Sequence, residues 1–329
     1  MNKKINSKIT GTGSFAPPRI LTNYDLEKMV DTSDEWIIAR SGIRERRIVE
    51  DGMVSSDLAL EASKIALNEA GLEPDQIDLI LVGTVTPDYL LPSTACILQD
   101  KLKIKNAAVM DIAAACSGFI YGLSIASAFI GIGQYKNVLV IGVEILSKIT
   151  NWEDRNTCVL FGDGAGAAVV SATTEEKGIL GTFLSGDGSL ANLLHISVGG
   201  TKVPLTKENI DLKQQYICME GSEVFKSAVR AMEDAAEHII QKVGLSPEEI
   251  DLLIPHQANL RIIEALAKRL KLPMEKVFVN IDRYGNTSAA SVPIALDEAR
   301  KKGLIKEGSN TVLVAFGAGF TWGSAVIRW

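Results

Sequence analysis

The segment Gly71-Leu-Glu-Pro-Asp-Gln-Ile-Asp-Leu-Ile80 recurs in the second half of the chain as Gly244-Leu-Ser-Pro-Glu-Glu-Ile-Asp-Leu-Leu253. In both copies a helical pattern comes before the segment, over residues 58–70 and 224–243, and an apolar strand pattern comes after it. Two halves with the same order of elements predict a duplicated, layered α/β fold.

The agreement continues downstream, where residues 138–143 correspond to residues 311–316 and each half closes on a glycine-rich strand hairpin. We therefore expect two halves, residues 1–175 and 176–329. The polar, turn-rich segment 185–220 is expected to form loops that cover the functional site rather than a separate domain.

The composition indicates a soluble enzyme: at 329 residues, 47% hydrophobic and 22% charged, the chain can bury a large core. We expect neither a signal peptide nor a membrane span, because no long apolar run is present. The net charge of −6 argues against nucleic-acid binding. No cluster at metal-ligand spacing and no CxxC motif occurs, which argues against a metal site and fits a reducing cytoplasm; the four cysteines are Cys96, Cys116, Cys158 and Cys218.

Cys116 lies between an apolar run at residues 107–112, predicted to be a buried strand, and an apolar helical pattern at residues 119–130. This order places the thiol at a helix N-terminus, where unpaired backbone N–H groups and the helix dipole favour a thiolate. Small neighbouring residues leave room for a substrate to reach the sulfur. The alternative is a buried structural cysteine.

His256 and Asn286 each follow a short apolar run, at residues 250–254 and 277–280, and each precedes a helical pattern. Both should therefore lie at the carboxyl end of a strand, where open α/β sheets place their chemistry. With Cys116 they form a nucleophile, a proton-handling base and a neutral amide donor. This combination favours a catalytic role for Cys116.

A set of motifs along essentially the whole chain resembles the 3-oxoacyl-[acyl-carrier-protein] synthase III enzymes of the thiolase superfamily. The motifs are Thr32-Ser-Asp-Glu-Trp36-Ile-Ile-Ala-Arg40-Ser-Gly-Ile-Arg44-Glu-Arg46, Ala114-Ala-Cys116-Ser-Gly118, Asn151-Trp-Glu-Asp-Arg155, His256-Gln-Ala-Asn-Leu-Arg261, Tyr284-Gly-Asn286-Thr-Ser and Gly317-Ala-Gly-Phe-Thr-Trp-Gly323. The resemblance implies a five-layer αβαβα fold, a homodimer, and condensation of an acyl-CoA primer with malonyl-acyl carrier protein. That reaction initiates fatty acid biosynthesis and uses no cofactor, since the CoA thioester is a substrate.

In this family the cysteine takes the acyl group from CoA, so the resemblance assigns that role to Cys116. It assigns His256 and Asn286 as hydrogen-bond donors to the enolate that forms when the malonyl group loses CO2. An asparagine here, rather than a second cysteine, favours decarboxylative condensation over thiolase-type cleavage. The acylation oxyanion is expected on the backbone N–H groups of Cys116 and Ala318. The family often has glycine at position 318, but a backbone amide acts there, so Ala318 changes little.

The resemblance also implies a CoA site and a carrier-protein site. Trp36 and Arg155 match residues that hold the adenine of CoA between an indole face and a guanidinium. Arg40 matches a residue that contacts the nucleotide. Asn259 matches a residue near the pantetheine arm. The carrier-binding residues would be Gln257, Ala258, Asn259, Leu260, Arg261 and Lys226. Arg261, Lys268, Arg269 and Lys271 would form a basic helix for an acidic carrier, or else only a solvated helix face.

Leu91 matches the family residue that reaches across the dimer to close the partner's acyl pocket. Acetyl-preferring members often carry phenylalanine there, so the smaller Leu91 predicts room for a few more carbons in the primer. Alternatively, Leu91 is only a dimer-core residue.

Two other functions remain open, and the sequence separates the first of them poorly from a synthase III. One is a related ketosynthase or acyltransferase of secondary metabolism with the same three residues. The other is a non-catalytic acyl- or CoA-binding subunit, which the presence of both Cys116 and His256 disfavours.

Overall fold

The structure, a computed structural model, describes residues 5–329 and contains two main sheets. Sheet 1 has the strand order β1 (Asn6–Phe15), β7 (Asp163–Thr173), β6 (Asn137–Ile145), β4 (Leu79–Gly83) and β5 (Ala108–Ile112). Sheet 2 has the order β11 (Leu252–Pro255), β12 (Asn310–Gly317), β13 (Thr321–Arg328) and β8 (Gly178–Gly186). Each half contains parallel strands followed by an antiparallel hairpin, β6–β7 in one and β12–β13 in the other.

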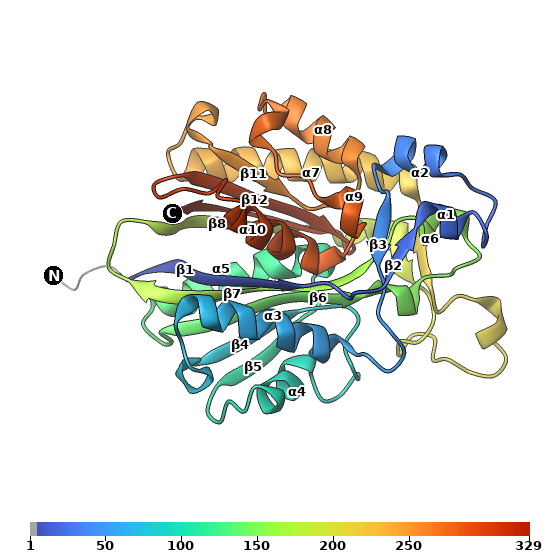
Figure 1. Cartoon of the computed structure of the whole chain (residues 1–329), viewed down its shortest axis with the longest axis horizontal. Helices are drawn as coiled ribbons and strands as arrows, with labels where there is room; N and C mark the ends of the chain where they lie inside the picture. Colours follow the sequence, from blue (N-terminus) through green and yellow to red (C-terminus); the bar gives the residue numbers. More distant parts are fainter. Residues whose placement is uncertain (1–4) are drawn as a thin grey trace.

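Helices form three layers around the two sheets (Figure 1). The outer face of sheet 1 is covered by α3 (Ser55–Ala70) and α4 (Thr94–Lys101), and the outer face of sheet 2 by α7 (Gly221–Lys242) and α8 (Leu260–Arg269). Between the sheets lie α5 (Gly118–Gly131) and α10 (Ser291–Lys301). The predicted duplicated, five-layer αβαβα fold is confirmed.

The sequence explains which helices lie inside and which outside. The central helix α5 contains no charged residue, as expected of a helix packed between two sheets. The outer helix α7 alternates buried apolar and exposed charged residues at helical spacing and turns its apolar side to sheet 2. On the outer face of sheet 1, α3 packs closely on β1. A Cβ at Gly11 of β1 would lie 2.2 Å from the carbonyl oxygen of Ala66 in α3. Only glycine permits that approach.

Short elements gather at one end of the molecule (Figure 1). They are the helices α1 (Asn23–Leu26), α2 (Asp34–Ser41), α6 (Arg155–Cys158) and α9 (Ile281–Tyr284), and the two-stranded ribbons β2 (Ile20–Thr22) with β3 (Glu45–Arg47) and β9 (Leu194–Ile196) with β10 (Ile217–Met219). The turn between β7 and β8 links the two main sheets, and we propose it as the boundary between residues 1–175 and 176–329. Within residues 5–329, no helix has both the length and the apolar character needed to cross a membrane.

Two local expectations were wrong. Residues 277–280 form no strand but a single parallel bridge between Val277 and Leu253, after which the chain enters α9. The run 107–112 forms a strand, but β5 is not buried, because among the described residues it is the edge strand of sheet 1 and pairs with β4 alone. Its side chains Ala108 and Met110 are exposed.

Candidate active site

Cys116 lies in the short turn Ala115–Ser117, between β5 and the start of α5, as the sequence predicted. Ala115 has φ +45°, a left-handed conformation that a non-glycine residue adopts only when its surroundings impose it. The Ser117 hydroxyl ties the turn to the Ala114 carbonyl at 2.8 Å and to the Thr321 hydroxyl at 2.6 Å. These contacts anchor the turn that carries the sulfur.

The thiol of Cys116 is strongly desolvated. Burial raises the pKa of Cys116 to about 12; a hydrogen bond from the Ser288 side chain opposes this rise, and the charge of Glu144 adds to it. The backbone at the helix start still acts in the expected direction, since a backbone hydrogen bond lowers the pKa of the thiol, but burial opposes it. Desolvation of the charged sulfur is the largest influence on this pKa.

His256 follows β11 directly and is buried, with 3% of its surface exposed. Its Nδ1 lies 2.6 Å from Oγ of Ser291, the first residue of α10. Burial lowers the pKa of His256 to about 3, so the ring is neutral at physiological pH. The ring is thus suited to donate or accept a hydrogen bond rather than to carry a positive charge.

Asn286 follows α9 and is also buried. Its backbone is anchored on both sides, since its N–H donates to Leu160 at 2.8 Å and its carbonyl accepts from Gly162 at 3.0 Å. The side-chain Oδ1 accepts the N–H of Ser288 at 2.9 Å. Because the oxygen is occupied, the Nδ2 amide is the group left to act as a donor.

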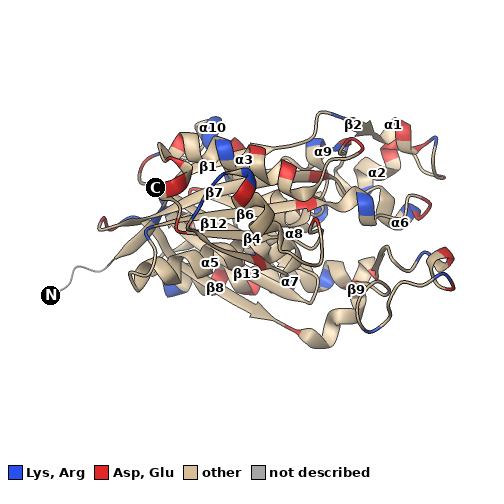
Figure 2. Ribbon diagram, turned by 90° about the horizontal axis from the view of Figure 1, so that it is seen from below, with Lys and Arg blue, Asp and Glu red and all other residues tan. Residues whose placement is uncertain are grey.

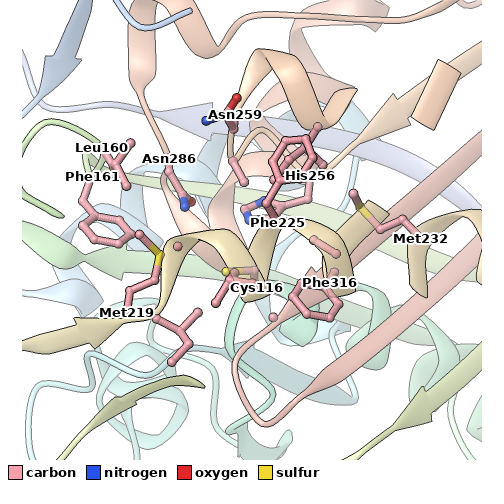
Figure 3. Close-up of a pocket in the computed structure, with 17 residues that line it drawn as sticks. Cys116, Leu160, Phe161, Met219, Phe225, Met232, His256, Asn259, Asn286 and Phe316 are labelled. Atoms are coloured by element: carbon pink, nitrogen blue, oxygen red, sulfur yellow. The ribbon is translucent and has the colours of Figure 1, made fainter. Parts of the chain in front are cut away.

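Cys116, His256 and Asn286 meet at a cavity of about 120 Å³, although they come from three distant segments (Figure 3). The remaining lining is mostly apolar and includes Met219 and Phe225. An apolar lining excludes water and strengthens polar interactions with a bound substrate.

A second cavity of about 270 Å³ lies against Cys116 and is lined mainly by apolar residues. Leu194, His195 and Ile217 of the segment 185–220 contribute to its wall, as Met219 does to the first cavity. This confirms that the segment covers the site. The structure places His195 at this cavity, with Nε2 2.9 Å from the Ser197 hydroxyl.

An outer groove of about 670 Å³ is lined by Trp36, Arg40, Lys226, Asn259 and Arg261, all singled out from the sequence. It shares Met219, Phe225 and Asn259 with the inner cavity, so the two are adjacent. A long substrate could therefore extend from the protein surface to the thiol.

Two arginines lie against Trp36 at the groove. The guanidinium carbon of Arg155 is 4.1 Å from the ring centroid and that of Arg40 is 5.5 Å away. Basic residues on α2 and α6 lie at the same end of the molecule (Figure 2). With Arg155 in direct contact with the indole, an aromatic ring would enter only if the guanidinium moved outward.

The stretch 257–261 divides into inner and outer residues. Gln257 is 1% exposed, and its amide donates to Pro255 at 2.8 Å and to Phe278 at 3.1 Å, so its side chain cannot touch a docking partner. Asn259 caps α8 through the Arg261 N–H and donates to the Arg40 carbonyl at 2.9 Å. Both of its polar groups have partners within the chain, so Asn259 can touch a ligand mainly by packing against it.

Some basic side chains around the outer groove and α8 have an ion-pair partner, and others do not. Ala258 and Leu260 are half-buried, whereas Arg261 is exposed. The guanidinium carbon of Arg261 lies 5.7 Å from the centroid of the Phe225 ring. Lys226 pairs with Glu223 at 2.8 Å, and Arg269 pairs with Glu233. Among residues 5–329, Arg261, Lys268 and Lys271 make no ion pair; they are the free charges of the basic helix.

Leu91 and Ala318 occupy contrasting positions. Leu91 is 87% exposed and is not among the residues lining the three cavities described above. Ala318 lines the second cavity with Cys116, and the neighbouring Gly317 packs so closely that a Cβ there would lie 2.6 Å from the Cys116 amide nitrogen. The two expected oxyanion amides therefore belong to adjacent backbone segments.

Sequence reasoning missed Glu144, Ser288 and Ser291. Ser288 and Ser291 follow Asn286 so closely that the motif pointed to their neighbourhood without a role for them. Glu144 is a lone acid at the end of the apolar strand β6, and that polar interruption was the available signal. Within residues 5–329, no group of three His, Cys, Asp or Glu side chains is placed to hold a metal ion.

The layered fold and the cysteine at the end of its central helix define a thiolase-type condensing acyltransferase. Family models described as 3-oxoacyl-[acyl-carrier-protein] synthase III match residues 110–188 and, for the C-terminal region, residues 240–329. A beta-ketoacyl-[acyl-carrier-protein] synthase III of Caldanaerobacter subterraneus subsp. tengcongensis is 59% identical over 329 residues, covering 100% of this chain and 99% of the relative.

Solved structures agree. The 3-oxoacyl-[acyl-carrier-protein] synthase III from Aquifex aeolicus superposes with a TM-score of 0.92 at 52% identity, covering 98% of this chain and 100% of that one. The priming beta-ketosynthase of the R1128 polyketide pathway gives 0.91 at 33% identity, covering 100% and 98%. The chain belongs to the 3-oxoacyl-[acyl-carrier-protein] synthase III family.

Proposed function

We propose that the protein condenses an acyl-CoA primer with malonyl-acyl carrier protein, giving a 3-oxoacyl-acyl carrier protein, CoA and CO2. In the first half-reaction, Cys116 attacks the thioester and CoA leaves. In the second, the malonyl group loses CO2 and its carbanion attacks the acyl-enzyme. The CoA thioester is a substrate, so the reaction needs no cofactor.

The observation that carries this proposal is that His256 and Asn286 offer donors at the cavity and no charged base. The Ser291 oxygen accepts the Gln257 N–H at 3.4 Å, so its own proton is available to His256 Nδ1. The ring proton then resides on Nε2, facing the cavity. With the Nδ2 amide of Asn286, it can hold the enolate oxygen formed on decarboxylation, where negative charge develops.

The backbone amides of Cys116 and Ala318 would bind the oxyanion of the acylation step. The second cavity would hold the primer chain, because its lining is mainly apolar and touches the thiol. The pantetheine arm would run through the first cavity past Asn259. The adenine would lie at Trp36 between the indole and the Arg155 guanidinium, with Arg40 near the nucleotide.

We propose that the carrier protein docks at the mouth of the outer groove. The free charge of Arg261 would attract an acidic carrier, and Lys226, paired with Glu223, lines the same groove. Ala258 and Leu260 would contribute apolar contact at the same place. Gln257 takes no part because it is buried.

We further propose a homodimer. The β5 edge has exposed apolar side chains and an unpaired backbone, which in a soluble protein is normally covered. The loop 87–93 ends next to β5, since the Thr94 N–H donates to Asp111 of that strand at 2.7 Å, and in this loop Tyr89 is 65%, Leu90 93% and Leu91 87% exposed. Such a projecting apolar loop is suited to insertion into a partner subunit, where Leu91 would close the primer cavity.

A polyketide-priming ketosynthase is the second candidate, favoured by the structural match at 33% identity. Turnover with malonyl groups on carrier proteins of fatty acid and polyketide type would separate the two. We place the protein in the cytoplasm, since all four cysteines are free and Cys116 must remain reduced.

The test of the function is covalent. Incubation with a short acyl-CoA and no malonyl donor should add one acyl group per chain, at Cys116, as seen by intact-mass and peptide spectra. Cys158→Ala is the matched control, because that buried cysteine lies outside the cavities and should leave the adduct in place. An adduct that persists in Cys116→Ala would overturn the assignment.

A further inference from the structure

The carboxylate of Glu144 lies behind the thiol and has no part in the function proposed above. Glu144 is fully buried at the end of β6. Its oxygens accept hydrogen bonds from the Thr84 hydroxyl at 3.3 Å, the Thr86 hydroxyl at 2.5 Å, the Val85 amide at 3.1 Å and the Ser288 hydroxyl at 3.2 Å. A buried carboxylate satisfied by neutral donors alone is costly to keep, which suggests a use for it.

Ser288 connects this carboxylate to the thiol. Its hydroxyl donates to Glu144 at 3.2 Å, and Ser288 lines the second cavity together with Cys116, where its side chain acts to lower the pKa of the thiol. While its own proton points to the carboxylate, its oxygen can accept the S–H of Cys116. Once that proton has moved to Ser288, the hydroxyl donates to the thiolate, which agrees with the lowering effect of Ser288 on the thiol pKa. Ser288 has φ +48° and is fixed there by its N–H bond to Asn286, so the hydroxyl is held in place.

The thiol needs a proton acceptor that the other residues do not supply. Burial raises the pKa of Cys116 to about 12, and the pKa of His256, lowered by burial to about 3, makes that ring a weak base. Burial raises the pKa of Glu144 to about 7, although its hydrogen bonds oppose the rise. A carboxylate with that pKa is ionised above neutral pH yet still basic enough to take a proton.

Given Cys116 as the nucleophile of the proposed function, we propose that Ser288 and Glu144 carry the thiol proton away during acylation. As Sγ bonds to the acyl carbon, the S–H proton passes to Ser288 Oγ while the Ser288 proton passes to a Glu144 oxygen. CoA leaves as a thiolate and takes a proton from solvent. When condensation releases the Cys116 thiolate, the proton returns from Glu144 by the same path.

This cycle consumes one solvent proton per turnover, as the overall reaction requires. Ser288 touches the reacting sulfur and is the catalytic residue of the pair, whereas Glu144 acts through it as a positioning residue. The groups facing Glu144 come from the end of β4, from the turn containing Ser288 and from the Cys116 turn. All of these groups are neutral while the thiol is protonated. The protonation state of Glu144 therefore determines at which pH the Cys116 proton can be accepted.

The test compares wild type, Glu144→Gln and Ser288→Ala in two reactions at Cys116, acylation by acyl-CoA and alkylation by iodoacetamide, each followed by mass spectrometry as a function of pH. We expect both variants to react about 10²-fold more slowly at neutral pH and to gain rate as pH rises. Glu144→Asp and Ser288→Thr should recover part of the rate, because each keeps the functional group.

The opposite result is equally specific. If Glu144 is only a buried negative charge that raises the thiol pKa, Glu144→Gln lowers that pKa and both reactions become faster at neutral pH, which overturns the proposal. Unchanged pH profiles in Glu144→Gln or in Ser288→Ala also overturn it, so either variant suffices if the other does not fold.

The matched control is Asp163→Asn, since Asp163 is a buried carboxylate that bonds to Val49 and Ser147 instead. It should leave both pH profiles unchanged. A wild-type chain that is alkylated but never acylated at Cys116 would count against the proposed function. An acylated wild type with unaffected variants would count against the proton path alone.

Discussion

At the scale of single residues, burial sets the protonation state of the site. It raises the pKa of Cys116 and of Glu144 and lowers the pKa of His256, in each case because the charged form loses its hydration. The thiol and the imidazole are therefore neutral at rest. Negative charge on the sulfur and on the substrate oxygen appears only during the reaction, and the donors of His256 and Asn286 are already in place to meet it.

His256→Ala and Asn286→Ala should separate the two half-reactions. Both variants should still be acylated at Cys116, because neither side chain is needed to bind the acylation oxyanion. Decarboxylation of the malonyl group should fall by about 10²–10³-fold, the usual cost of losing one oxyanion donor. Intact mass measures the first step and CO2 release the second; an equal loss of both would assign His256 to activation of the thiol instead.

Glu144 should make the stability of the protein depend on pH. Its folded-state pKa is raised from 4.5 to about 7, so between these values the folded chain binds a proton that the unfolded chain has lost. The free energy of unfolding therefore falls as pH rises through this window, and Glu144→Gln does not share the fall. The stability of the variant relative to wild type should grow by up to about 3 kcal/mol from acidic to mildly alkaline pH.

Urea unfolding of both proteins at several pH values measures this difference. Contributions from other titrating groups, His256 among them, cancel because both chains contain them. A difference that stays constant with pH would show that Glu144 has an ordinary pKa in the folded protein.

At the scale of elements, the entrance to the site is formed by residues of α2 and α6 and of the N-terminal end of α8. The amphipathic helix α8 turns Ile262, Ile263 and Leu266 to sheet 2 and starts at the Asn259 cap, which is itself bonded to α2. This arrangement leaves Arg261 exposed at the groove. The same end of the molecule presents the Trp36 and Arg155 pair of α2 and α6.

Arg261→Glu should therefore raise KM for malonyl-acyl carrier protein and leave acylation by acyl-CoA nearly unchanged. The wild-type KM should also rise with salt, because charges separated by more than about 10 Å are screened at 0.1 M ionic strength. Lys64→Glu on α3 is the control, since it makes the same charge change on the far side of sheet 1. If KM for the carrier protein changes neither with salt nor in Arg261→Glu, the basic helix is only a solvated surface and does not bind the carrier.

At the scale of the whole molecule, the exposed edge of β5 and the exposed loop 87–93 are the surfaces that the proposed homodimer would cover. Leu91 lies outside the cavities of its own chain, so it can influence primer choice only from a partner subunit. In the proposed dimer it closes the primer cavity with a smaller side chain than phenylalanine.

Wild type should accept four- or five-carbon and branched primers at least as well as acetyl-CoA, because each added buried methylene contributes about 0.8 kcal/mol. Leu91→Phe should shift kcat/KM back toward acetyl-CoA over isobutyryl-CoA. Leu90→Phe, at the neighbouring exposed position, serves as the control. An unchanged ratio in Leu91→Phe would make Leu91 a dimer contact only.

Much of the fold and the central three residues could be predicted from the chain alone. The repeated segment and its flanking patterns specify the layered halves, because strand and helix periodicities are local. Cys116, His256 and Asn286 stand out for the same reason, since each follows an apolar run and precedes a helical pattern. Local patterns failed at residues 277–280, where apolar side chains pack without completing a strand.

Only the tertiary structure decided the chemistry of those residues. The neutral state of the thiol, the Ser291 contact of His256 and the path from Cys116 through Ser288 to Glu144 depend on side chains from distant segments meeting out of water. The exposed edge of β5 and the burial of Gln257 are likewise results of packing. Sequence periodicity specifies which face of an element is apolar, whereas desolvation and hydrogen bonding depend on what finally packs against that face.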